Sequence, residues 1–575
     1  MKKILALALC LLMLVPMIVS CEDDPNVKKG ATIEMYLGSN IYNFDPVTAY
    51  TDEAATRIFG LIYQGLFELN SKGKVQKALC KDYKVIEDEE HQTYKMHITI
   101  NETGWSDGRA VSVDDVIFAW KRVLDPEKNY PMASLLFDIQ NAKKYNNGDC
   151  SPDDVGLFPI DTDEFEIYFE GKINYDLFIE NIASPLLTPL REDIVAKAED
   201  GWATNVAIMV GNGPFAVRGF EPGKKLNIQR NTFFYRTSKQ AEDKVVKSYK
   251  ITIDLSKNPS KQLDLFDEKE IFFDSELAVA SRADASKVKT VDTQSVHTYY
   301  FNTNNELFKN AKVRQALSMA LDREALASSI VYADPATGLI TNGVFETKAG
   351  SSFRKNGGDI LQTTADVSGA KKLLSEAGVK GGSFTLMIRD NEVDVALANA
   401  AKKSWESLGF KVEIKKTGFE KFTTSNEYEV YSDEFEKLFT AGEFDVAGLD
   451  LQMFSTDAFA TLAQYAVGYS GNAIDLSLNS ENYDPKPSVT GYNSEEYNKL
   501  IDEAYGLYND RAARSAKLHE AETLLLKDLP ITPVVVLKTG YKSSSKVKGY
   551  KFGYYGQLDF TKVKMSGRSK TVEGK

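Results

Sequence analysis

The chain has 575 residues and a formal net charge of −13, with 43% hydrophobic and 26% charged residues. That length exceeds a single hydrophobic core, so we expect two or three domains of ordinary soluble-globular composition. An acidic chain is a poor partner for nucleic acid, because phosphate binding depends on clustered lysine and arginine. After the N-terminus no segment approaches 18 consecutive apolar residues, so none is predicted to span a membrane.

The N-terminus has the pattern of an export signal. Lys2 and Lys3 precede an uncharged apolar run over residues 4–19, which is too short for a bilayer span of about 20 residues. The run closes on isoleucine, valine and serine before Cys21, which looks like a bacterial lipobox. The alternative is an ordinary secretory signal with an accidental cysteine.

The lipobox interpretation places the mature protein outside the cytoplasm. Residues 1–20 are then a signal peptide, Cys21 carries the acyl chains, and residues 21–31 form a lipidated tether. Two or more acyl chains anchor stably to a membrane, whereas one does not. Removal of residues 1–20 deletes two lysines and no acids, which takes the net charge from −13 to −15.

Helical and strand patterns alternate along the rest of the chain. Ser112 and Asp115 form a capping box, followed by apolar residues at helical spacing until Asp125 and Pro126 end the helix. Further predicted elements are a strand over 162–169, helices over 310–327 and 395–408, and a strand over 410–414. This mixture favours layered α/β or α+β architecture over a bundle or a sandwich.

The cysteines beyond the signal constrain the fold little. Cys80 and Cys150 remain, and either a disulfide between them or two buried free thiols fits an extracytoplasmic protein.

No catalytic motif is complete. The segment 211–214, Gly-Asn-Gly-Pro, lacks the lysine and hydroxyl of a phosphate-binding loop. His519 and Glu520 begin a zinc-protease pattern, but Thr523 stands where the second histidine is needed. With four histidines in the whole chain, we expect a binding protein rather than an enzyme, with no metal site and no cofactor.

The segment GWSDGRAVSVDDVIFAWKRVLDP (104–126) resembles the most diagnostic stretch of the family 5 extracellular solute-binding proteins. These are the oligopeptide- and dipeptide-binding lipoproteins of ABC importers. The resemblance continues in order through residues 58–83, 210–235, 308–324, 371–378 and 490–505, and so covers nearly the whole mature chain.

The resemblance implies an α/β, two-lobed periplasmic-binding-protein type II fold of cluster C, with an extra subdomain inserted in the first lobe. By analogy the first lobe comprises residues 31–66, 156–300 and 532–575, the inserted subdomain 67–155, and the second lobe 302–531. Strands near 296–301 and 531–537 would cross between the lobes, which would close on the solute.

Family members hold a peptide as an added strand, and the matching segments here are 50–52 and 450–454. The implied ligand-binding residues are Tyr50, Asp52, Glu276, Tyr299, Asp450, Gln452, Phe454 and Asp457. For Tyr299 the alternative is core packing, and for Asp450 it is a strand-end charge in water.

One departure from the family pattern affects the ligand. Peptide binders resembling this chain carry an aspartate that pairs with the peptide's amino terminus, and Phe454 stands at that place. Asp450 and Asp457 flank it. We favour Asp450 as an anchor in a shifted register, because Asp457 precedes an apolar segment and suits a helix cap.

The leading functional hypothesis is a monomeric, membrane-tethered receptor that captures oligopeptides and delivers them to an ABC permease. Oligosaccharides or another solute remain an alternative, since 28 tyrosines and 31 phenylalanines offer stacking surfaces. A peptide-sensing or adhesion lipoprotein that has lost transport is another, and a secreted hydrolase is disfavoured.

Overall fold

The computed structural model describes residues 27–28, 30–38, 40–41, 43–128, 130, 132–198, 201–235, 242–256, 259–469, 488–566 and 572–573. The predicted signal peptide, Cys21 and most of the predicted tether lie outside the described residues. Among those described, no helix combines the length and apolar character needed to cross a membrane.

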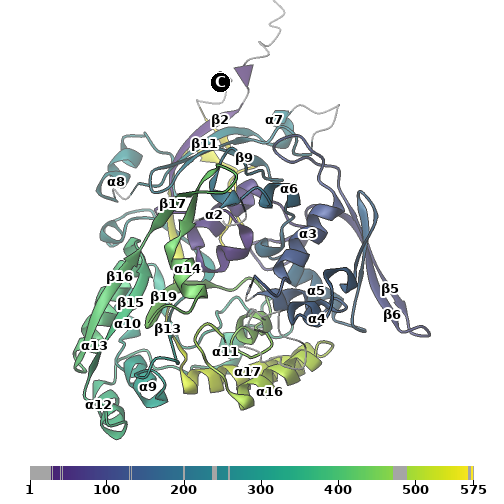
Figure 1. The fold of residues 1–575 in the computed structure, drawn as a ribbon. Helices are drawn as coiled ribbons and strands as arrows, with labels where there is room; N and C mark the ends of the chain where they lie inside the picture. The colour runs from purple at the N-terminus through teal and green to yellow at the C-terminus, as the bar shows by residue number, and fades with distance from the viewer. Residues whose placement is uncertain are drawn as a thin grey trace, which may run out of the picture.

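One sheet of eleven strands runs through the molecule (Figure 1). Its order is β16-β15-β19-β13-β20-β12-β2-β11-β10-β9, with β14 paired to β20. The strands are β2 (Ala31–Tyr36), β9 (Phe215–Glu221), β10 (Lys225–Arg230), β11 (Ser248–Asp254), β12 (Phe273–Asp274), β13 (Lys289–Phe301), β14 (Ala333–Pro335), β15 (Gly382–Arg389), β16 (Phe410–Thr417), β19 (Val446–Gln452) and β20 (Ile531–Ser543). We call the part built on β2 and β9–β12 the first lobe, and the part built on β15, β16 and β19 the second lobe.

Two thirteen-residue strands, β13 and β20, join the lobes. They pair antiparallel with each other, while β20 continues to β12 of the first lobe and β13 continues to β19 of the second. The predicted crossing strands at 296–301 and 531–537 are therefore confirmed as parts of β13 and β20. The register between them shifts between Asp292 and Ser295, where Gln294 has a positive φ of 55°, and such a bulge bends a strand pair locally.

A separate four-stranded sheet, ordered β5-β6-β8-β7, projects from the first lobe at the right of Figure 1. Its strands are β5 (Cys80–Asp88), β6 (Thr93–Ile100), β7 (Leu157–Asp161) and β8 (Glu164–Tyr168). Strands β7 and β8 follow residue 155, where the insertion was expected to end, yet β8 pairs directly with β6.

Helices cover the sheets on both sides of the crossing strands. They are α2 (Glu53–Ile62), α3 (Val113–Val123), α4 (Ala142–Asn146), α5 (Tyr175–Ile182), α6 (Glu192–Val195), α7 (Glu242–Val245), α8 (Pro259–Asp267), α9 (Ala311–Met319), α10 (Arg323–Ile330), α11 (Phe353–Gly357), α12 (Val367–Glu376), α13 (Glu392–Glu406), α14 (Glu434–Thr440), α15 (Phe459–Ala463), α16 (Glu495–Gly506) and α17 (Arg511–Asp528). Short paired strands complete the described chain: β1 (Val27–Lys28) with β25 (Val572–Glu573), β3 (Phe67–Leu69) with β4 (Val75–Lys77), β17 (Phe419–Thr423) with β18 (Glu429–Asp433), β21 (Val547–Lys548) with β24 (Lys564–Met565), and β22 (Lys551–Phe552) with β23 (Leu558–Asp559).

Most predicted elements are present, and one is wrong. The capping box before α3 is confirmed, because the Asp115 carboxylate accepts a 3.0 Å hydrogen bond from the backbone N–H of Ser112. The single helix predicted over 310–327 is instead α9 and α10. Asp322 interrupts it by accepting a hydrogen bond from Ala325 N–H, and so begins a new helix.

The described hydrophobic core forms two clusters. The smaller one lies in the second lobe and the crossing strands, and the larger one extends from the first lobe and the projecting sheet into the second lobe, where it includes Ala447, Leu449 and Leu451 of β19. All four tryptophans of the sequence are buried, and Trp405 Nε1 donates to the carbonyl of Leu317. Cys80 and Cys150 are free thiols, and only Cys80 is fully buried.

Candidate functional site

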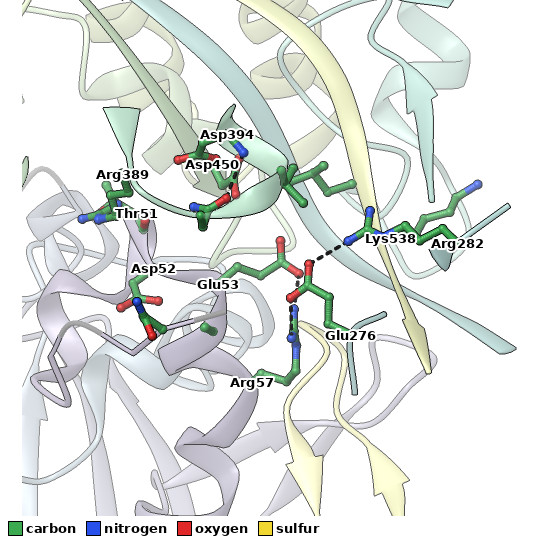
Figure 2. Close-up of a pocket in the computed structure, with 15 residues that line it drawn as sticks. Thr51, Asp52, Glu53, Arg57, Glu276, Arg282, Arg389, Asp394, Asp450 and Lys538 are labelled. Carbon is green, nitrogen blue, oxygen red and sulfur yellow. Dashed lines mark hydrogen bonds and ion pairs between the residues drawn. The ribbon is translucent and has the colours of Figure 1, made fainter. Parts of the chain in front are cut away.

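A small cavity of about 40 Å³ lies where α2, α13, β15 and β19 meet the crossing strand β20 (Figure 2). That volume has room for a few water molecules. It is lined by Asn40, Thr51, Asp52, Glu53, Ala54, Arg57, Glu276, Arg282, Arg389, Asn391, Val393, Asp394, Asp450, Leu537 and Lys538. Five of these side chains are carboxylates and four are lysine or arginine, so charge dominates the site.

The first lobe contributes the start of helix α2. Asp52 is the N-cap, and its carboxylate accepts a 3.0 Å hydrogen bond from Ala55 N–H. Glu53 follows and pairs with Arg57 one turn later at 2.9 Å, the i,i+4 spacing that places two side chains on one helix face. Burial raises the pKa of Glu53 to about 7, although the positive charge of Arg57 acts to lower it.

Arg57 connects α2 to the rest of the cleft. It donates to Glu276 at 3.0 Å and to the hydroxyl of Thr539 on β20 at 3.1 Å. Glu276 in turn accepts from Arg282 at 3.1 Å, and Figure 2 shows Glu276 between the two guanidinium groups. Burial opposes the charge of Arg57, but Glu276 and Glu53 outweigh it and leave the pKa of Arg57 above its ordinary value.

Arg389 joins the two lobes. It ends β15 in the second lobe, where it pairs with Asp433 at 2.7 Å. The same guanidinium donates to the backbone carbonyl of Thr51 and, at 3.1 Å, to the Thr51 hydroxyl. Thr51 closes the short 3₁₀ helix Pro46–Thr51 of the first lobe, and its hydroxyl donates to Glu436 at 3.2 Å. One buried side chain therefore bonds both lobes across the cleft, beside further cross-lobe bonds such as that from Tyr431 N–H to the Thr204 hydroxyl.

Two aspartates on the second-lobe side of the cavity contact a buried histidine. His297 on β13 lies opposite Asp450 on β19 in the strand register, and its Nδ1 is 2.6 Å from Asp450 Oδ1. Asp394, in the first turn of α13, lies 3.8 Å from the same nitrogen. Burial lowers the pKa of His297, but the hydrogen bond and charge of Asp450, with the charge of Asp394, leave that pKa above its ordinary value. Burial and the charge of Asp450 raise the pKa of Asp394 to about 8.

The structure brings three of the sequence-predicted ligand residues together. Asp52, Glu276 and Asp450 all line the cavity. Tyr50 lies in the 3₁₀ helix before α2, and its side chain is outside the described part of the chain.

The other predicted residues lie away from the cavity. Tyr299 packs in the second-lobe core, with its ring 5.2 Å from that of Trp405. The buried amide of Gln452 donates to the carbonyls of Thr293 and Tyr555, and Phe454 packs against the Tyr555 ring.

Asp457 also lies outside the lining. It accepts from Phe459 N–H at the start of α15 and pairs with Arg514 at 3.3 Å. It therefore holds a helix start, as its sequence position suggested.

Sequence reasoning missed most of the charged lining. The i,i+4 pair Glu53 and Arg57 was detectable, since both precede an apolar helical pattern. Arg389, Asp394 and His297 gave no signal, because their partners lie on other elements far along the chain.

We expect Arg389→Lys to loosen the closed cleft, because one ammonium cannot reach both Asp433 and the two oxygen atoms of Thr51. Small-angle X-ray scattering of the ligand-free variant should give a larger radius of gyration than the wild type. Arg109→Lys is the matched control: Arg109 also pairs with two aspartates, Asp115 and Asp193, neither of them in the second lobe. Identical scattering from Arg389→Lys and wild type would show that this contact does not hold the lobes.

The raised pKa of Asp394 predicts a pH dependence of stability. Its pKa lies above the ordinary value of 3.8, so the native state keeps a proton that the unfolded chain releases. Between those two pKa values stability therefore falls as pH rises, by at most about 1.4 kcal/mol per pH unit. Asparagine carries no such proton, so in Asp394→Asn the free energy of unfolding should fall less steeply with rising pH than in the wild type.

Urea denaturation over about pH 5 to 8 measures how the free energy of unfolding changes with pH. Asp284→Asn, at an exposed position, is the control and should keep the wild-type slope. A slope in Asp394→Asn as steep as in the wild type would contradict the assignment.

Comparison with known proteins identifies the family. The model of the bacterial extracellular solute-binding proteins, family 5, matches residues 74–473. The dipeptide-binding protein DppE of Bacillus subtilis is 26% identical over 530 residues, covering 90% of this chain and 89% of DppE. The substrate-binding domain of an oligopeptide ABC transporter from Bacillus anthracis superposes with a TM-score of 0.76 at 21% identity, covering 94% of this chain and 100% of that one. Listeria monocytogenes OppA, whose structure contains bound peptide, gives 0.76 at 19% identity with the same coverage. The chain has their two-lobed cluster C fold and belongs to the family 5 extracellular solute-binding proteins, which are receptors and not enzymes.

Proposed function

We propose that this protein is a membrane-tethered receptor on the extracytoplasmic side that captures oligopeptides and delivers them to an ABC permease. Two relatives support the ligand class, since one is named a dipeptide-binding protein and another has been solved with peptide bound. Cys21 would carry the anchor. The lobes would divide as the resemblance implies, except that the insertion extends through β8, because β8 pairs with β6.

The observation that carries the proposal is the charge pattern of the cleft. An extended peptide presents an ammonium at one end and a carboxylate at the other. The cavity offers carboxylates such as Asp450 on one wall and guanidinium groups such as Arg57 and Arg389 nearby, which suits a zwitterion.

Uptake requires the lobes to separate, because a cavity of about 40 Å³ cannot hold a peptide. The bulged strand pair β13 and β20 is the covalent path between the lobes and supplies the hinge. Release of Arg389 from Thr51 would then open the cleft to solvent.

Asp450 is our proposed anchor for the peptide ammonium. One of its oxygens is held by His297, and its side chain remains 16% exposed while it lines the cavity. Asp457 does not compete for this role, because it is buried against Arg514 and does not line the cavity.

The lining gives less support to oligosaccharide binding. Sugar sites use aromatic faces for stacking, and none of the 15 residues around this cavity is aromatic. Among the side chains that the structure describes, no tyrosine or phenylalanine lines this cavity.

We expect short peptides, and not cello- or xylo-oligosaccharides, to bind the full-length protein in mild detergent and raise its melting temperature. Asp450→Asn should weaken peptide binding by about 1.5–3 kcal/mol, the range for a hydrogen bond to a charged group. Isothermal titration calorimetry measures this loss. Asp457→Asn is the matched control, and it should lower the melting temperature while leaving peptide affinity unchanged.

Two results would redirect the proposal. Unchanged peptide affinity in Asp450→Asn would remove this anchor and favour a ligand without a free amino terminus. A thermal shift with oligosaccharides and none with peptides would replace the proposed ligand class.

The tether has its own test. Cys21→Ala should abolish lipidation and move the protein from the membrane fraction to the soluble extracytoplasmic fraction, because no acyl chain then remains to anchor it. Cell fractionation followed by immunoblotting measures the change, with Cys80→Ala as the control that stays in the membrane fraction. A Cys21→Ala protein that survives a high-salt wash on the membrane would rule out the lipid anchor.

A further inference from the structure

Three potential metal ligands converge beside the cavity from three separate elements: Asp394 and Asp450 line it, and His297 is buried behind them. Cross-strand pairing of β13 and β19 puts His297 directly opposite Asp450. The capped start of α13 adds Asp394, whose backbone N–H donates to Asn391 Oδ1 at 2.8 Å. Regular secondary structure therefore fixes all three side chains, and none depends on a long loop.

Their spacing is close to that of a coordination shell. His297 Nδ1 lies 2.6 Å from Asp450 Oδ1 and 3.8 Å from Asp394 Oδ1, and the three ligand atoms all lie within 4.8 Å of one another. Bonds of about 2.0–2.2 Å to a tetrahedral ion set neighbouring ligand atoms about 3.4 Å apart. Side-chain adjustments of about an ångström would complete that geometry.

The cluster also contains buried polar atoms without partners. The His297 and Asp394 side chains are 0% and 4% exposed. Asp394 Oδ1, the oxygen facing His297, has no hydrogen-bond partner, and neither does the hydroxyl of Tyr299, which senses the charges of both aspartates. A buried carboxylate oxygen beside a second carboxylate is costly unless a cation compensates it.

We propose that His297, Asp394 and Asp450 bind one divalent first-row transition-metal ion, with Zn²⁺ as the reference ion. One imidazole nitrogen and two carboxylate oxygens suit Zn²⁺ and its neighbours in that series, whereas Ca²⁺ and Mg²⁺ use oxygen ligands alone. Two carboxylates and a neutral imidazole also balance the charge of a divalent ion.

The surroundings accommodate the ion. Ligation of the ion through His297 Nδ1 leaves a proton on Nε2. Nε2 has no hydrogen-bond partner in the structure, and a protonated imidazole would also carry a proton there, so metal binding adds no further unpartnered donor. The nearest guanidinium, Arg389, is compensated by Asp433 and Glu436. Asp394 and Asp450 face the cavity, so water or a donor atom of a bound solute can complete the coordination. The site does not depend on the solute being a peptide.

Calorimetric titration of Zn²⁺ into chelator-stripped, full-length protein tests the site without any peptide. We expect one ion per chain, and a loss of affinity of at least about tenfold in both His297→Gln and Asp394→Asn. His519→Gln is the matched control, because His519 also pairs with a carboxylate, Glu346 at 2.8 Å, away from this cluster, and it should bind Zn²⁺ like the wild type.

X-ray absorption of the zinc-loaded wild type provides a readout that does not depend on how the variants fold. A shell of one imidazole with oxygen atoms supports the site. Sulfur or a second imidazole in the shell, no saturable Zn²⁺ binding, or unchanged affinity in both variants would overturn it. Peptide binding measured with and without Zn²⁺ then separates failure of this site from failure of the proposed function.

Discussion

The pairing of β13 with β20 is the constraint on which the rest of the molecule depends. These two strands are the only long stretch of sheet shared by both lobes in the described chain, and they continue into a different partner strand on each side. The cleft side chains are placed relative to this pair. Thr539, Leu537 and Lys538 come from β20, and His297 comes from β13. If this pair is the hinge, as proposed, it would bend without exchanging partners, and the two walls of the cleft would keep their own geometry while the gap between them changes.

The cleft gathers more charge than a folded interior usually tolerates, and most of that charge is compensated within one lobe or across the gap. Arg57 and Arg282 together balance the charges of Glu53 and Glu276. Arg389 has its own carboxylates in the second lobe. What remains is the cluster of His297, Asp394 and Asp450, where the two carboxylates outnumber the one imidazole. Burial, together with this imbalance, raises the pKa of Asp394, and the same imbalance would favour a cation at the cluster, whether proton, metal ion or ligand ammonium.

The sequence predicted the local structure and the order of elements better than it predicted the site. The α3 capping box and the two crossing strands are encoded by neighbouring residues, so the local sequence was enough to predict them. The 310–327 helix failed because the apolar spacing continues past Asp322, whereas aspartate is disfavoured in a helix interior and favoured as an N-cap, so a second helix begins there.

The structure separates the predicted site residues by their local contacts. Asp52, Glu276 and Asp450, which the resemblance suggested, all line the cavity. Gln452 lies two residues after Asp450, on the same face of β19, but its amide bonds the carbonyls of Thr293 and Tyr555, and Asp457 holds the start of α15. Resemblance locates the segment, whereas the local partners of each side chain decide which ones face the cavity. In the proposed function, the internal partners of those side chains would set the energetics of binding: a ligand ammonium at Asp450 would compete with His297, and a ligand carboxylate at Arg389 would compete with Thr51 and Asp433. Affinity would therefore be the difference between the charge-assisted bonds that the ligand makes and the internal bonds that it replaces. Only a solute whose bonds are the stronger set would shift the population towards its own bound, closed state.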